Sequence, residues 1–432
     1  MKIVAILPAK GSSSRIESKN LKLLDGQPLF LHSLTRLVES GIFDDVYLDT
    51  ECEEIIELAS VVDCKVLKRD PLLASNKTDG NRLFYNEVKQ IDADIYVQVL
   101  CTSPFIELSK VKDAINKICS SEEYDSAVLV KKDRQYTWSD GSPDYDISNI
   151  PNSVDLGDTI IETMGLYVVK REAALATKRR IGDRPYLIEA SPLDAIDVNW
   201  PEDFDLAELI AAGSREKERK LLENLKNHIS SCILSDLLDD FGYPNQVVRG
   251  LAPNFGDVKV LGRAKTLKLR KLEEGEDFRG IYNALFSYDT ITPGDIILVE
   301  NDIPDYAYFG ELNANLAIRQ GAVGVIVNGA TRDQSEVKST GLPVFARGYS
   351  CQDVRKRATT ESYNKKIQLD GVEILPNYLV FADAEGVVVI PKHIEQRVID
   401  EVFKRASNEK SILREIAMGT DVAQLTKNYG FF

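Results

Sequence analysis

The sequence predicts an α/β protein of two units, and three observations support this class. In the first half, short apolar runs alternate with helix-like segments. A long charged segment follows over residues 201–227. The remaining half returns to a mixed pattern with more strands and with glycines at many turns. A chain of 432 residues is long enough for two or three domains, each with its own core.

The alternation in the first half indicates a mostly parallel sheet wrapped by helices. The runs that predict strands are KIVAIL, DVYLDT, CKVLKR, ADIYVQVL and SAVLVKK. The segments that predict helices are PLFLHSLTRLVESG, CEEIIELASVV, NRLFYNEVKQI and LSKVKDAINKICSS. Sheets of this kind bind ligands at the carboxyl ends of their strands. Residues 10–19, 69–80 and 102–105 are therefore expected at one edge.

The charged segment predicts the boundary between the units. We expect a first domain over residues 1–213, a linker helix over residues 214–228 and a second domain over residues 229–432. The linker reads SREKERKLLENLKNH, and its run of charges favours a solvated helix face.

The second half predicts a capped helix followed by a strand-rich α/β pattern. The helix is SSCILSDLLDDFG, and the strands include VKVLGRAKTLKLRKL, DIILVE, AVGVIVNG and LPVFARG. A helix over YFGELNANLAIRQG lies between the second and third of these strands. Further strands in VEILPNYLVFADAEGVVVIP precede a terminal helix over residues 394–418.

Composition excludes several classes of protein. The formal net charge of −15 disfavours a nucleic-acid coat or an anionic membrane surface. No apolar run approaches the roughly 20 residues of a membrane span. Met1 leads directly into the first predicted strand, so we expect no signal peptide and a cytoplasmic location. The six cysteines and three histidines show no metal-binding spacing, which favours reduced thiols.

The stretch AKGSSSRIESKN after the first strand suits a triphosphate. Small residues leave backbone N–H groups accessible, and Lys10, Arg15 and Lys19 supply positive charge. The spacing is not that of a P-loop. Taken alone, a basic surface loop explains the stretch equally well.

The wider pattern resembles the CMP-acylneuraminate synthetases, which are cytidylyltransferases that activate sialic acids and related 3-deoxy-ulosonic acids. The landmarks run in family order: LPAK with the basic loop and KN, then KRDPLLAS, TSPF, GLYVVK and AIDVNWPEDFDLAE. The resemblance implies a Rossmann-like nucleotidyltransferase fold for the first half. It also implies that Lys10, Arg15 and Lys19 hold the triphosphate of CTP.

The same resemblance implies further site residues. Asn20 and Arg69 would read the cytosine edge, with Ser75 also in the nucleotide site. Asp197 and Asn199 would bind Mg²⁺, and alternation along a strand would point both side chains to one face. The family more often has a second carboxylate at Asn199, so the number of bound ions stays open.

The implied reaction is attack of the sugar's anomeric hydroxyl on the α-phosphate of CTP, with loss of pyrophosphate. No strong general base is visible in the sequence. Two departures concern the sugar: the chain has IETMGLY without the arginine usual before that landmark, and Gln98 falls early, with Leu100 at the aligned position. We therefore expect a keto-deoxy acid other than ordinary N-acetylneuraminate.

In the second half, Arg332 and Asp333 stand side by side after an apolar strand. A carboxylate for a divalent metal beside an arginine for a 2-keto acid suits enolate chemistry. An isolated Arg-Asp pair is also commonly a salt bridge in a turn. The pair therefore needs its wider context.

That context resembles the family of the ribonuclease-activity regulator A proteins and the class II 4-hydroxy-4-methyl-2-oxoglutarate aldolases. The landmarks are SDLLDDFG, VLGRAKT, PGDIILVE, FGELNANLAIRQGAVGVIVNGATRD, GLPVFARG and VFADAEGVVVIP. The resemblance implies an α/β swivelling barrel. Asp333 would bind Mg²⁺, Arg332 and the turn of Gly310, Glu311 and Leu312 would hold pyruvate, and Glu311 would hold metal-bound water. A glutamate from a neighbouring subunit also contributes in that family, and Glu409 is our candidate.

These patterns predict a fused enzyme in which a CTP:ulosonate cytidylyltransferase precedes a pyruvate aldolase-like domain. Two alternatives stay open. The second half acts only as an oligomerisation or binding module, or the whole chain is a regulatory protein with both sites inert. Twofold contacts from one half and threefold contacts from the other would close a homohexamer.

Overall fold

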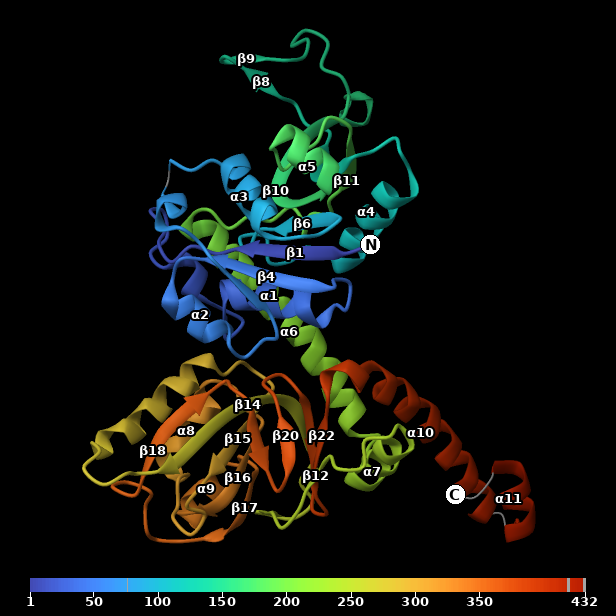
Figure 1. The fold of residues 1–432 in the computed structure, drawn as a ribbon. Coiled ribbons are helices and arrows are strands. Elements are labelled where there is room, and N and C mark those ends of the chain that lie inside the picture. Colours follow the sequence, from blue (N-terminus) through green and yellow to red (C-terminus); the bar gives the residue numbers. More distant parts are fainter. Residues whose placement is uncertain (76, 418–419, 430–432) are drawn as a thin grey trace. The chain divides into compact units, whose positions relative to one another are not determined.

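The computed structural model describes residues 1–75, 77–417 and 420–429. Its chain divides into two compact units, Met1–Ala211 and Ala212–Phe432, and the α/β class predicted for both halves is confirmed (Figure 1). No helix in the described ranges is both long and apolar enough to cross a membrane.

A seven-stranded sheet forms the centre of the first unit, in the order β11-β7-β10-β6-β1-β4-β5. The strands are β1 (Ile3–Pro8), β4 (Asp45–Thr50), β5 (Lys65–Lys68), β6 (Ile95–Val99), β7 (Ser126–Asp133), β10 (Thr159–Lys170) and β11 (Pro185–Glu189). Strand β10 runs antiparallel to both neighbours, whereas the other adjacent pairs are parallel. The predicted mostly parallel sheet is therefore confirmed.

Helices cover both faces of this sheet. They are α1 (Leu29–Glu39), α2 (Glu53–Ala59), α3 (Gly80–Gln90), α4 (Leu108–Ser120) and α5 (Arg171–Thr177). One core packs Phe30 of α1 and Val111 of α4 against alternate strand residues such as Val97. The opposite core packs Phe84 of α3 against Tyr96. Because alternate strand residues point to opposite faces, this two-sided burial explains why the strands read as continuous apolar runs.

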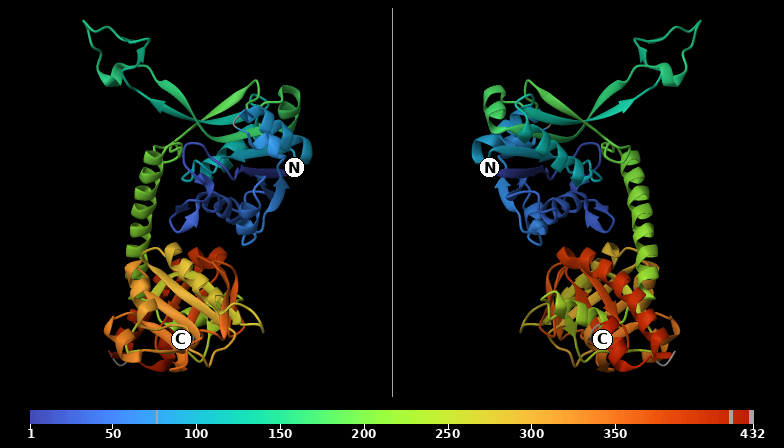
Figure 2. Two further views of the ribbon diagram at one scale, coloured as in Figure 1. Left: turned by 90° about the vertical axis from the view of Figure 1, so that its left-hand side faces the viewer. Right: turned by 90° about the vertical axis from the view of Figure 1, so that its right-hand side faces the viewer.

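A hairpin of β8 (Trp138–Ser139) and β9 (Ser142–Pro143) lies between β7 and β10. Figure 2 shows it extending away from the sheet of the first unit. Residues 134–158, which include this hairpin, form the β8–β9 arm, and large apolar side chains are exposed on it, among them Trp138, Ile147 and Val154. The sequence reading did not identify it.

The second unit contains a nine-stranded mixed sheet. Eight strands follow the order β12-β22-β21-β14-β15-β16-β17-β13, and β18 pairs with β14. The strands are β12 (Val247–Val248), β13 (Ala252–Pro253), β14 (Val260–Lys271), β15 (Asp295–Asn301), β16 (Gly324–Thr331), β17 (Val344–Tyr349), β18 (Ala358–Tyr363), β21 (Leu379–Ala382) and β22 (Val387–Ile390). One edge of β14 is shared, with β21 along its first part and β18 along its last. This division lets the sheet curl, as the predicted barrel architecture requires.

The helical segments of the second unit include α7 (Ser231–Asp240), the 3₁₀ segment η4 (Phe278–Thr290), α8 (Glu311–Arg319), α9 (Gln334–Ser339), α10 (Glu395–Ala417) and α11 (Val422–Tyr429). The side chain of Ser230 caps α7 by accepting a hydrogen bond from the Ile233 nitrogen at 3.3 Å. The cap predicted from the sequence is therefore present. A short hairpin of β19 (Ile367–Leu369) and β20 (Val372–Ile374) contributes apolar side chains to one of the cores.

The expected solvated linker is wrong in one respect. Helix α6 (Pro201–Lys226) is continuous, but its second part packs into the second unit, where Leu222 and Leu225 are buried. Arg215 contacts Asp295 at 3.2 Å. Glu218 accepts a hydrogen bond at 3.1 Å from the nearly buried Arg263.

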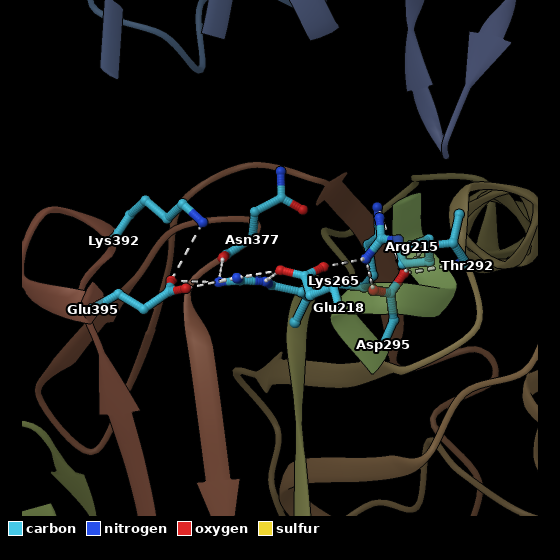
Figure 3. Close-up of polar contacts among 9 residues, drawn as sticks. Arg215, Glu218, Lys265, Thr292, Asp295, Asn377, Lys392 and Glu395 are labelled. Atoms are coloured by element: carbon cyan, nitrogen blue, oxygen red, sulfur yellow. Dashed lines mark hydrogen bonds and ion pairs between the residues drawn. The ribbon is translucent and has the colours of Figure 1, made fainter. Parts of the chain in front are cut away.

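Arg263 is also bound from its other side, because it donates a hydrogen bond to Glu395 at 2.7 Å. Figure 3 shows Arg215, Glu218 and Glu395 in this network. The partners lie far apart in the sequence, so a local reading of the helix as a charged face could not reveal them.

Candidate functional site

The basic loop begins where β1 ends, at the carboxyl edge of the sheet. Lys19 opens the 3₁₀ turn η1 (Lys19–Leu21) and is 7% exposed. Its ammonium donates a hydrogen bond to the Val198 carbonyl at 2.7 Å. Burial lowers the pKa of Lys19, and the neighbouring cations Arg15 and Lys10 lower it further. Because Val198 lies between Asp197 and Asn199, this bond joins the basic loop to the predicted metal-binding segment.

Asn20 folds the loop onto the strand ends. Its amide nitrogen donates to the Lys10 carbonyl at 2.8 Å. Its amide oxygen accepts a hydrogen bond from the Cys101 thiol at 3.2 Å. Burial raises the pKa of Cys101 to about 11, so the thiol keeps its proton near neutral pH. The exposed Arg15 lies over the Trp200 ring, 5.6 Å from its centroid.

Arg69 is buried and makes several hydrogen bonds to Asp49. Its guanidinium donates to both carboxylate oxygens of Asp49, at 3.1 and 3.0 Å, and to the Asp49 carbonyl at 2.8 Å. A third carboxylate oxygen, from Glu51, lies 3.6 Å away. Glu51 also accepts a hydrogen bond from the Gly11 nitrogen at 2.8 Å, so it ties Arg69 to the basic loop.

The sequence reading missed Asp49 and Glu51. Asp49 lies near the end of strand β4 and Glu51 directly follows that strand, at the carboxyl edge of the sheet, and that position was the available signal. Two further buried residues complete the network. Gln98 donates to the Glu87 carboxyl at 2.7 Å, and burial together with the charge of Asp49 raises the pKa of Glu87. Gln98 therefore points into this network.

The strand expected at Asp197 and Asn199 is wrong, because residues 196–199 lie outside any strand. The expected convergence of their side chains is nevertheless present, since the Asn199 amide donates a hydrogen bond to the Asp197 carboxylate. Asp203 fixes the segment by accepting bonds from the backbone nitrogens of Asn199 and Trp200, at 2.9 and 2.8 Å.

The Asp197 carboxylate and the Asn199 amide oxygen fit a magnesium ion that takes most of its ligands from phosphates and water. One carboxylate and one amide oxygen are hard oxygen ligands, as Mg²⁺ prefers. No group of three or more His, Cys, Asp or Glu side chains within the described ranges is arranged to hold a metal by itself.

Ser75 follows the turn η2 (Pro71–Ala74) and is exposed, with its hydroxyl 3.3 Å from that of Thr78.

In the second unit, the predicted residues converge at the ends of β16 and α8. Asp333 has a left-handed backbone with φ of 53°, and its carboxylate accepts a hydrogen bond from the Glu311 nitrogen at 3.1 Å. A side chain at Gly310 would place a Cβ 2.4 Å from the Asp333 carboxylate, so a larger residue there would displace this carboxylate. Arg332 lies 3.6 Å from Asp333 and 2.6 Å from Asp353.

These groups line a cleft of about 760 Å³. Its other wall is apolar and includes Tyr282, Leu285 and Leu316. Leu312 is 78% exposed at the cleft margin. The sequence reading missed Asp353, which follows β17 and is not adjacent to the GATRD stretch. The side chain of Glu409, in α10, is outside the described part of the structure.

Two family models match the chain. The model for Cytidylyltransferase matches residues 4–187, and the model for Aldolase/RraA matches residues 231–389. The pseudaminic acid cytidylyltransferase of Campylobacter jejuni subsp. jejuni serotype O:2 is 34% identical over 128 residues, covering 28% of this chain and 55% of that protein.

The N-acylneuraminate cytidylyltransferase A of Danio rerio is 26% identical over 246 residues, covering 54% of this chain and 56% of that protein. The putative 4-hydroxy-4-methyl-2-oxoglutarate aldolase of Halalkalibacterium halodurans is 28% identical over 190 residues, covering 44% of this chain and 85% of that protein. The chain thus spans about half the length of the two transferases it matches. The chain therefore carries a cytidylyltransferase domain followed by a domain of the Aldolase/RraA family.

Proposed function

We propose that the first unit transfers a cytidylyl group from CTP to a 3-deoxy-2-ulosonic acid of the sialic or pseudaminic class. The observation that carries this proposal is the hydrogen bond of 2.7 Å between Lys19 and the Val198 carbonyl. It joins the basic loop to the Asp197–Asn199 segment, which supports a site where the first would hold the triphosphate and the second would supply oxygen ligands. The names of the two transferase relatives support the acceptor class.

In this reaction the anomeric hydroxyl of the acid forms a bond to the α-phosphorus of CTP. The bond to the β-phosphate breaks, pyrophosphate leaves, and the hydroxyl proton passes to a nearby carboxylate. Lys10, Arg15 and Lys19 stabilise the charge that develops on the phosphates. Asn20 and Arg69 hold the base, and Ser75 borders it. Mg²⁺, when held by Asp197 and Asn199, would neutralise phosphate charge.

The test is pyrophosphate release from CTP and Mg²⁺ with a panel of ulosonic acids, with UTP and ATP as control nucleotides. We expect release that depends on both CTP and one class of acid. If the folded protein releases no pyrophosphate with any acid of the panel, the proposal for this class of acids is contradicted.

For the second unit we propose metal-dependent aldol or decarboxylation chemistry on a 2-keto acid. Asp333 would hold a divalent metal, Glu311 its bound water, and Arg332 with the Gly310–Leu312 turn the keto acid. The supporting observation is the room that Gly310 leaves beside the Asp333 carboxylate. One observation favours a non-catalytic binding module instead: the Arg332 guanidinium already pairs with Asp353 at 2.6 Å.

Pyruvate release from keto-deoxy acids, and decarboxylation of oxaloacetate, separate these two functions. Turnover that requires added Mg²⁺ or Mn²⁺ supports catalysis. Inertness toward every compound, with either metal, supports the binding module.

We also propose a homohexamer. The exposed apolar side chains of the β8–β9 arm would supply contacts between first units, and second units would associate around a threefold axis through their own surfaces. Light scattering tests this assembly, and a monomer at micromolar concentration would contradict it.

A further inference from the structure

Arg180 lies in the loop between α5 and β11, and its side chain is held in a fixed position. The centre of its guanidinium is 4.0 Å from the centroid of the Tyr167 ring. A Cβ at Gly80, the first residue of α3, would lie 2.6 Å from a guanidinium nitrogen. The Arg180 backbone nitrogen donates to the Asn81 side chain at 3.1 Å. The guanidinium is therefore held against the ring and the start of α3.

The cation is also without a counterion in the described ranges. Its neighbours Arg179 and Arg184 pair with Asp183 and Asp125. No carboxylate of the described residues makes a comparable pair with the Arg180 guanidinium. A planar cation that is fixed and desolvated on one face is well suited to bind a carboxylate with two parallel hydrogen bonds.

The position of Tyr167 relates this cation to the transferase site. Tyr167 is fully buried in β10, directly opposite Gln98 of β6, and its hydroxyl donates to Glu162 at the start of β10. It is two residues from Gly165, which packs against Ser103 of the TSPF stretch. Asp197 acts electrostatically on both Lys19 and Tyr167. Figure 1 shows α3 and α5 beside β10.

The distance along the sheet distinguishes this cation from the triphosphate loop. Lys10, Arg15 and Lys19 follow β1, whereas Tyr167 lies on β10, two strands away in the order β1-β6-β10. Two strand spacings are about 10 Å, which is the scale of a sugar attached to the α-phosphate. Arg180 therefore belongs to the acceptor half of the site.

We propose that Arg180 binds the carboxylate of the acceptor sugar acid and makes the transferase selective for acids. This inference rests on the proposed function. It assigns the anionic group of the acceptor to one residue of this chain, the guanidinium that lies over the Tyr167 ring.

The experiment uses the full chain and three variants. Arg180→Met removes the cation. Gly80→Ala keeps the cation but displaces it, because the added methyl group occupies the position of the guanidinium. Arg179→Met is the matched control, since it removes the neighbouring arginine that pairs with Asp183.

Pyrophosphate release is measured with N-acetylneuraminate, a pseudaminic acid and 2-keto-3-deoxy-octonate, and with the primary amide of each active acid. Arg180→Met should raise the KM for the acid about 10- to 100-fold, as loss of charge-assisted hydrogen bonds does. The KM for CTP should stay within about twofold, and the preference for acid over amide should disappear. Gly80→Ala should shift the acid KM in the same direction, and Arg179→Met should match the wild type.

An unchanged KM for the acid in Arg180→Met would overturn the proposal. An equal rise in KM for the acid and for its amide would also overturn it. A raised KM for CTP would assign Arg180 to the nucleotide instead and would also overturn it.

A binding measurement separates this inference from the proposed function. Each acid is titrated by calorimetry into protein loaded with α,β-methylene-CTP, which cannot release pyrophosphate. Binding to the wild type that Arg180→Met abolishes supports the carboxylate site even if no acid is turned over. Binding that Arg180→Met leaves intact, or no binding of any acid to the wild type, would refute it.

Discussion

The Arg69 guanidinium donates hydrogen bonds to both carboxylate oxygens of Asp49, and neither side chain is more than 3% exposed. A buried charge that loses its partner is costly. The pair therefore stabilises the carboxyl edge of the sheet, where Arg69 is proposed to meet the base.

We expect Asp49→Asn to lower the free energy of unfolding of the first unit by roughly 3–5 kcal/mol, because the buried Arg69 then loses the carboxylate that it contacts most closely and keeps only Glu51, at 3.6 Å. Urea unfolding followed by tryptophan fluorescence measures this, since both tryptophans, Trp138 and Trp200, lie in the first unit. Glu53→Gln is the control, because it breaks an exposed pair with Lys68 and should cost under about 1 kcal/mol. Equal losses in the two variants would contradict the prediction.

Glu87 predicts how stability changes with pH. Burial and the nearby Asp49 raise the pKa of Glu87 well above its ordinary 4.5. The folded state therefore holds this proton more tightly, so the contribution is fully present below pH 4.5 and is lost as pH rises toward the raised pKa. Glu87→Gln has no proton to lose, and it should gain stability relative to the wild type as the pH rises above 4.5. Parallel urea midpoints across that range would show that Glu87 does not titrate there.

The transferase residues should act independently of the second unit. We expect Lys19→Ala and Asp197→Ala each to lower cytidylyl transfer about 100-fold or more, as lost charge stabilisation at a phosphoryl centre does. Arg332→Ala should leave this activity nearly intact. The assay is CTP-dependent pyrophosphate release, with circular dichroism as the check on folding. Loss of transfer in a folded Arg332→Ala protein would show that the sites are coupled.

Asp333 should be required for any lyase activity. Its carboxylate accepts a hydrogen bond from the Glu311 nitrogen in the cleft. The stretch NGATRDQ contains no other carboxylate that could take its place. Asp333→Ala should abolish metal-dependent pyruvate release and oxaloacetate decarboxylation. Glu336→Ala, a nearby exposed acid on α9, is the control and should keep full activity. Activity that survives Asp333→Ala would remove this residue from the site.

Helix α6 predicts where the chain divides into stable fragments. Phe204, Ala207 and Ala211 are buried in the first unit, so a fragment of residues 1–213 should fold and release pyrophosphate. A fragment of residues 212–432 should fold, whereas one of residues 229–432 should lose the bonds of Arg215 and Glu218 and be destabilised. Thermal unfolding of the three fragments measures this. Equal midpoints for the two C-terminal fragments would contradict the assigned role of the helix.

The sequence determined the α/β class, many of the helices and strands, and both family resemblances. Strands β10, β11 and β18 and helices α5 and α11 were not predicted. Strand DVYLDT is β4 as predicted, and Ser230 caps α7 as its motif indicates. Such features depend on local periodicity, caps and contiguous motifs, which are properties of neighbouring residues. The roles assigned to Lys10, Lys19, Asp197, Asp333 and the other site residues stay predictions.

Only the tertiary structure decided which distant residues meet. It paired Arg69 with Asp49, joined Lys19 to Val198, placed Arg180 on Tyr167, and bound Arg263 between Glu218 and Glu395. It also showed that Asp197 and Asn199 converge without a strand, and that the charged helix of the linker packs against the second unit. Most of these contacts join residues that are far apart in the sequence and meet only in the folded chain. The convergence of Asp197 and Asn199 depends on an irregular backbone conformation, which sequence periodicity does not predict. The sequence shows which residues are charged, but the three-dimensional packing decides which oppositely charged group each of them pairs with.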